Sequence, residues 1–241
     1  MERNLTTGSV AKNLIFFSLP YLLSYFLQTL YGMADLFIIG QYEGVASTTA
    51  VSVGSQVMHM LTVMIVGLGM GTTVSIGQAI GANDKRRAAN AIGNTVTLFA
   101  VVAAGMFAIL LLLVNPILQV MSMPREAVAG TRIYLTICFV GIPFIIAYNV
   151  ISSIFRGLGD SKSPMYFIAI ACVINIALDY LFMGAFHMGA AGAALGTTLS
   201  QAVSVVISLF MIRKKKMGIA LKKQNLRPKR RVMGQILNIG V

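Results

Sequence analysis

Six long apolar stretches constrain this chain more than any other feature of its sequence. They cover residues 13–40, 50–80, 91–115, 132–155, 164–186 and 189–212, with short charged segments between them. The hydrocarbon core of a bilayer is about 30 Å thick, and about 20 apolar residues cross it as a helix. The run from Phe107 to Val114 (FAILLLLV) lacks the alternation that a transmembrane β-barrel strand requires. The sequence therefore predicts an all-α membrane protein, a bundle of six transmembrane helices.

The composition supports a lipid bilayer as the surrounding medium. Hydrophobic residues make up 57% of the chain and charged residues only 11%, whereas about a quarter of the residues in a soluble domain are charged. The net charge of +12 would suggest a nucleic-acid partner if its distribution were ignored. The positive charges instead gather on one side of the predicted bundle, so we do not expect nucleic acid as a partner.

Lys and Arg are confined almost entirely to one side of the predicted bundle. If the N-terminus is cytoplasmic, all of the 19 except Arg125 and Arg132 fall on the cytoplasmic side, including the basic tail 213–231. This asymmetry is the positive-inside pattern of membrane insertion. It predicts a multi-pass protein of the plasma (inner) membrane with a cytoplasmic N-terminus and tail. An additional affinity of the tail for anionic lipid stays open.

Two acidic residues lie inside the predicted spans, where ionisable groups are costly and are candidates for function. Asp35 lies near the outer end of 13–40, on a helical face with Ser24, Gln28 and Tyr31, which we expect to line a cavity. Asp179 lies in the outer half of 164–186. The alternative is that each Asp only hydrogen-bonds a neighbouring helix.

Helix rise places several oxygen donors at a common depth. At about 1.5 Å per residue, Asp35 lies about 8 Å, Asp179 about 10 Å and Thr197 about 12 Å from the outer ends of their helices. Asn175 precedes Asp179 by one turn. If the three helices are neighbours, Asp35, Asn175, Asp179 and Thr197 form one acidic cavity. Carboxylate, amide and hydroxyl oxygens suit Na⁺, and two carboxylates also suit a shared proton.

Four segments of the chain resemble the multidrug and toxic compound extrusion (MATE) family. The resemblance rests on PYLLSYFLQTLYGMADLFIIG (Pro20 to Gly40), GQAIGANDKRRA (Gly77 to Ala88), RGLGDSKSPM (Arg156 to Met165) and NIALDYLFM (Asn175 to Met183). It implies export of organic cations in exchange for Na⁺ or H⁺, with no further cofactor. It also implies a cation site at Asp35, Asn175, Asp179 and Thr197, with Thr198 as the alternative threonine.

The resemblance further implies one lobe of a twelve-helix, two-lobe transporter. Residues 1–212 would form the N-terminal lobe, 213–231 a basic cytoplasmic linker between lobes, and 232–241 the start of a truncated seventh helix. The apolar stretch VMGQILNIGV after the basic tail resembles the start of the first helix, as expected where a second repeat begins. The missing C-terminal lobe would then be a partner.

Two other functions remain open from the sequence. One is a flippase for lipid-linked oligosaccharides or cell-wall precursors, whose phosphates would require Lys or Arg within the spans, where we expect none. The other is a non-transporting membrane scaffold or channel subunit. An enzyme is not expected, because the sequence has no nucleophile–base set and no metal cluster. The sequence does not distinguish Na⁺ from H⁺ and does not identify the exported substrate.

Overall fold

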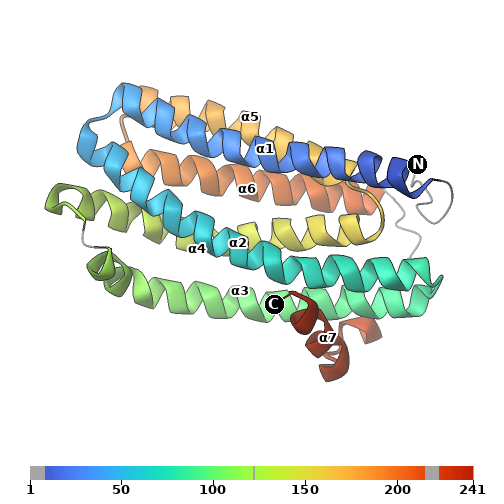
Figure 1. Cartoon of the computed structure of the whole chain (residues 1–241). Helices are drawn as coiled ribbons and strands as arrows, with labels where there is room; N and C mark the ends of the chain where they lie inside the picture. Colours follow the sequence, from blue (N-terminus) through green and yellow to red (C-terminus); the bar gives the residue numbers. More distant parts are fainter. Residues whose placement is uncertain (1–8, 122, 215–222, 241) are drawn as a thin grey trace.

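The chain forms an up-and-down bundle of six long helices in a computed structural model that describes residues 9–121, 123–214 and 223–240 (Figure 1). The long helices are α1 (Val10–Tyr42), α2 (Val45–Gly81), α3 (Lys85–Val120), α4 (Arg125–Gly157), α5 (Lys162–Asp179) and α6 (Gly189–Lys214). The short ones are the π-helix η1 (Tyr180–Ala185), which continues α5, the 3₁₀ turn η2 (Lys223–Leu226) and α7 (Arg230–Gly240). All six long helices, α5 together with η1, are long and apolar enough to cross a membrane. This confirms the predicted fold class.

Parts of the predicted domain division lie outside the described residues. These are the leader 1–8 with Arg3, residues 215–222 of the predicted linker, and Val241. A helix does form after the basic tail, over Arg230–Gly240. The division into a lobe at 1–212, a linker at 213–231 and the start of a further helix at 232–241 stays a prediction.

The long helices extend beyond the apolar stretches because polar residues at the turns can begin and end them. Asp84 caps α3, and its Oδ1 accepts a hydrogen bond of 2.8 Å from the backbone N–H of Arg87. The helix therefore begins at Lys85, six residues before the apolar stretch. Likewise α4 continues to Gly157. Arg156, which the apolar stretch 132–155 placed just beyond the fourth helix, therefore belongs to the last turn of α4.

The turn between α4 and α5 is built by the RGLGD segment. Gly159 has a φ of +88°, a left-handed conformation that glycine adopts without steric cost. Asp160 Oδ1 accepts hydrogen bonds from the backbone N–H groups of Lys162 (3.1 Å) and Ser163 (3.0 Å), and Oδ2 accepts from the Ser163 hydroxyl (2.6 Å). These bonds satisfy donors at the start of α5.

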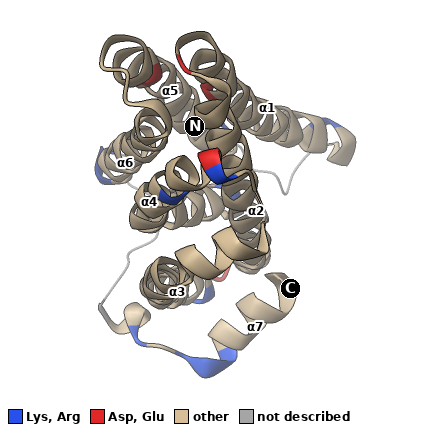
Figure 2. Cartoon of the chain, turned by 90° about the vertical axis from the view of Figure 1, so that its left-hand side faces the viewer, with Lys and Arg blue, Asp and Glu red and all other residues tan. Residues whose placement is uncertain are grey.

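Helix α4 forms the centre of the bundle. It contacts α2, α3 and α6, and 72% of its most apolar stretch of 18 residues is buried. Helix α1 packs against α5, and α3 and α7 lie on the opposite side of the bundle (Figures 1 and 2). Large apolar side chains such as Leu19, Val101 and Leu112 are exposed on the outer helices. Their exposure matches a lipid environment, which is as apolar as these side chains.

Candidate functional site

Asp35 of α1 and Asp179 of α5 lie next to each other inside the bundle. Helix α1 packs against both α5 and α6, and α5 packs against α6, so the three helices enclose the space between them. The side chain of Asp35 is 4% exposed and that of Asp179 is fully buried. Their carboxyl groups are close enough to interact directly. The structure therefore brings together the two acids that the sequence placed in separate spans.

The other two predicted ligands lie at the same place. The Thr197 hydroxyl of α6 donates a hydrogen bond of 3.2 Å to Oδ2 of Asp35. Asn175, 1% exposed, also neighbours the Asp35 carboxyl group. Thr198 points elsewhere: a Cβ atom built on Gly141 of α4 would lie 2.8 Å from its hydroxyl oxygen. Of the two threonines, Thr197 is therefore the one whose hydroxyl contacts Asp35.

Several oxygen atoms of this site have no hydrogen-bond partner among the described residues. They are Oδ1 of Asp35, both carboxylate oxygens of Asp179 and the amide oxygen of Asn175. A buried polar atom without a partner costs free energy, and an unpaired buried charge costs more. A monovalent cation or a proton between the two carboxyl groups would remove that cost. The donor set of carboxylate, amide and hydroxyl oxygens is the kind that hard cations prefer.

Gly196 forms a wall of the site that sequence reasoning did not single out. A Cβ atom at this position would overlap Oδ1 of Asp179 and would lie 3.6 Å from Nδ2 of Asn175. Glycine is therefore required for α6 to approach the two side chains so closely. The clue was available in the sequence, because Gly196 directly precedes Thr197.

Tyr31 and Gln201 adjoin the acidic pair. Tyr31 lies beside both Asp35 and Gln201 of α6, and the side chain of Gln201 is 3% exposed. Gln201 follows Thr197 by four residues, so both point to the same side of α6. A glutamine in an apolar span one turn from a candidate ligand was the signal that could have identified it.

Ser24 and Gln28 line a cavity other than the acidic one. That cavity has a volume of about 20 Å³, and its walls include Tyr21, Asn149 and Arg156. The Arg156 guanidinium lies 5.2 Å from the centre of the Tyr21 ring, and its Nη2 donates to the Ser153 hydroxyl at 3.3 Å. The polar residues on this face of α1 thus lie in two places. Tyr31 lies beside Asp35, whereas Ser24 and Gln28 line the cavity near Arg156.

Comparison with known proteins agrees with this fold. The family model for MatE matches residues 20–181. The chain is 36% identical over 212 residues to the probable multidrug resistance protein YpnP of Bacillus subtilis (strain 168), covering 88% of this chain and 48% of that protein. It is 30% identical over 240 residues to the probable multidrug resistance protein NorM of Thermotoga maritima, covering 96% of this chain and 50% of that protein.

A solved structure gives the same result in three dimensions. An outward-facing multidrug resistance MATE transporter of the MOP superfamily superposes with a TM-score of 0.91 at 27% identity, covering 98% of this chain and 52% of that one. The chain thus spans about half the length of the relatives it matches. The family match, the six-helix bundle and the structural similarity lead to one conclusion: the chain belongs to the multidrug and toxic compound extrusion family of membrane transporters.

Proposed function

We propose that this chain is one half of an antiporter that exports organic cations in exchange for Na⁺ or H⁺ by alternating access. Membership of the family and the names of its multidrug resistance relatives support export of drugs. The relatives are about twice as long, so transport would require a second half in addition to these six helices.

The observation that carries this proposal is the contact between two buried carboxyl groups, of which Oδ1 of Asp35 and both oxygens of Asp179 have no hydrogen-bond partner in the described part of the chain. Two such groups from different helices hold α1 and α5 together best when positive charge lies between them. A coupling ion would then favour one arrangement of the helices and disfavour the arrangement that holds the drug. Linkage makes this effect reciprocal, so the drug would also favour release of the ion.

The distribution of charge supports an orientation for this exchange. Lys and Arg gather at the end of the bundle that contains the start of α1 and the end of α6, and this would be the cytoplasmic end in the plasma membrane. Asp35 lies seven residues before the end of α1 at the opposite end. The acidic site would therefore lie in the outer half of the membrane, where external Na⁺ or H⁺ can reach it.

The test uses cells producing the transporter that contains this chain, with either Asp35→Asn or Asp179→Asn. We expect both variants to insert normally into the membrane and to lose efflux of a cationic dye driven by a Na⁺ or H⁺ gradient. Glu126→Gln, an exposed acid in the first turn of α4, is the matched control and should retain efflux. Dye efflux at the unmodified rate in both Asp variants would disprove the assignment of the site.

The flippase alternative gains one supporting observation, because Arg156 lies within α4 and lines a cavity. A cavity of about 20 Å³ holds roughly one water molecule, which is too little for a phosphate-linked sugar in this conformation. Proteoliposomes containing the transporter distinguish the two functions. Ion-driven uptake of dye without translocation of a lipid-linked sugar supports the antiporter, whereas the reverse supports the flippase. Neither activity would support the scaffold.

A further inference from the structure

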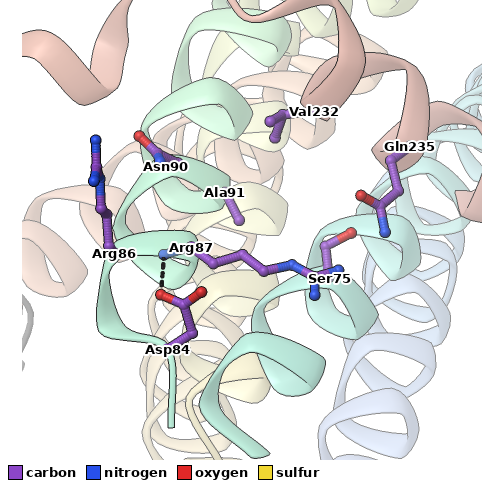
Figure 3. Close-up of a pocket in the computed structure, with 8 residues that line it drawn as sticks. All are labelled: Ser75, Asp84, Arg86, Arg87, Asn90, Ala91, Val232 and Gln235. Atoms are coloured by element: carbon purple, nitrogen blue, oxygen red, sulfur yellow. Dashed lines mark hydrogen bonds between the residues drawn. The ribbon is translucent and has the colours of Figure 1, made fainter. Parts of the chain in front are cut away.

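A further polar cavity lies far along the bundle from the acidic pair, between the end of α2, the start of α3 and α7. Its volume is about 220 Å³. Figure 3 shows the side chains of its eight lining residues, which are Ser75, Asp84, Arg86, Arg87, Asn90, Ala91, Val232 and Gln235. The proposed transport mechanism does not use these residues. We refer to this space as the α2–α3–α7 cavity.

Helix α7 is held over this cavity by polar side chains of α3. Asn90 Oδ1 accepts hydrogen bonds from Asn225 Nδ2 (2.9 Å) and from Lys229 Nζ (3.0 Å). Asn94 Oδ1 accepts from the backbone N–H of Lys229 at 2.6 Å, and the Thr97 hydroxyl donates to the backbone carbonyl of Leu226 at 2.7 Å. The segment before α7 is therefore fixed on one face of α3. This holds α7 in position as one wall of the cavity.

The lining of the α2–α3–α7 cavity favours a negatively charged group. Arg87 extends across it toward Ser75, and the side chain of Gln235 points toward the same serine from α7 (Figure 3). Ser75 is 6% exposed, and its hydroxyl has no hydrogen-bond partner among the residues described. The single acid of the lining, Asp84, accepts the N–H of Arg87 as the cap of α3. Two arginines thus line the cavity, and Arg87 is the one that extends toward Ser75, whereas the one carboxylate of the lining already accepts a hydrogen bond.

We propose that the α2–α3–α7 cavity binds the phosphate group of an anionic membrane lipid. Guanidinium groups form paired hydrogen bonds with phosphate oxygens, and the hydroxyl of Ser75 and the amide of Gln235 provide further donors. The cavity lies at the basic end of the bundle, where lipid headgroups meet the ends of the spans. Bound lipid would connect α7 to α2 and α3. A soluble phosphoester has the same charged group and is the alternative source.

Binding to the 241-residue chain in neutral detergent is measured by native mass spectrometry with phosphatidylglycerol, phosphatidylcholine or soluble glycerol phosphate. We expect retention of phosphatidylglycerol in preference to phosphatidylcholine, and about a fivefold loss of affinity in Arg87→Gln. Ser75→Leu fills the cavity without changing the charge and should also lose binding. The matched control is Arg213→Gln, an exposed arginine at the same end of the bundle but outside the cavity.

Each outcome distinguishes specific binding in the α2–α3–α7 cavity from nonspecific attraction of anionic lipid to basic residues. An equal loss in Arg213→Gln and Arg87→Gln, or unchanged binding in both Arg87→Gln and Ser75→Leu, would overturn the proposal. Competition by soluble glycerol phosphate that depends on Arg87 would support the phosphate site and identify a soluble ligand as the source. Thermal unfolding of each variant shows whether it is folded, and Arg87→Lys, which keeps the charge but not the paired geometry, tests the site if Ser75→Leu does not fold. This lysine variant should bind more weakly than the unmodified chain.

Discussion

The hydroxyl of Thr197 donates a 3.2 Å hydrogen bond to Oδ2 of Asp35 and so connects α6 to α1 beside the acidic pair. Its neighbour in sequence, Thr198, lies against Gly141 of α4 instead. Two adjacent threonines on one helix therefore serve different purposes. One completes a polar site, and the other packs between helices. This difference provides a sharp experimental contrast.

Thr197→Val should weaken binding of the coupling ion, whereas Thr198→Val should not. Valine has nearly the shape of threonine but lacks the hydroxyl that donates to Asp35. Because hydrogen bonds to charged groups contribute about 1.5–3 kcal/mol, we expect at least about a tenfold loss of apparent Na⁺ or H⁺ affinity in Thr197→Val. The affinity is measured as the ion dependence of thermal unfolding. Equal effects of the two substitutions would remove Thr197 from the site.

Asp179→Asn should stabilise the chain in sodium-free, alkaline buffer while abolishing its response to the coupling ion. The carboxylate is fully buried next to Asp35, and both its oxygens are without hydrogen-bond partners in the described structure. Removing this charge should raise the free energy of unfolding by about 1–3 kcal/mol. Chemical unfolding in detergent, with and without Na⁺, measures both effects. A destabilised variant would indicate that Asp179 serves mainly to hold the bundle together.

Gly196→Ala should disrupt the site although alanine is the best helix former. The added methyl group would overlap Oδ1 of Asp179. We expect loss of ion-dependent stabilisation together with a destabilisation of about 1–3 kcal/mol. Gly105→Ala in α3 is the control, because nothing lies within 4 Å of the added atom, and it should stabilise by up to about 1 kcal/mol. Unchanged ion dependence in Gly196→Ala would contradict the close approach of α6.

Asn94→Ala should release the segment that precedes α7. It removes the acceptor for the backbone N–H of Lys229, and leaving such a donor unpaired costs about 1–3 kcal/mol. Cleavage by trypsin after Arg227 should therefore become at least about fivefold faster. Thr136→Ala is the control, since its exposed hydroxyl donates to the backbone carbonyl of Arg132 in its own helix, at 2.7 Å. Equal cleavage rates in both variants would show that Asn94 does not hold the segment.

The helices could be predicted from the sequence because crossing a bilayer demands long apolar stretches, whatever the tertiary arrangement. Their ends were less predictable. Lys85 and Arg125 begin helices although they are charged, because the helix start depends on residues such as Asp84 that cap it. Helix α4 likewise continues past its apolar stretch to Gly157, because the turn that ends it is formed by Gly159 and Asp160.

The candidate site was predictable to the extent that charge in a membrane is costly. Asp35 and Asp179 are conspicuous in apolar helices, and helix rise alone gives their common depth. Sequence periodicity shows which residues share a helix face, but it does not show which other helix packs against that face. For that reason Ser24 and Gln28 were grouped with Asp35, although they lie near Arg156. The face of α3 formed by Asn90, Asn94 and Thr97 also escaped notice, because its partners lie more than a hundred residues further along the chain.

The π-helix that directly follows Asp179 has a consequence for how the site tolerates changes in chain length. In η1 the backbone N–H groups bond five residues back, as Phe186 does to Leu181 at 3.1 Å, so the turn holds one residue more than an α-helix would. A deletion of one residue between Tyr180 and Ala185 could be absorbed by rewinding this turn as ordinary α-helix. Asp179 would then keep its position beside Asp35. The π-helical turn therefore allows the chain to lose one residue next to a site whose own side chains must keep their positions.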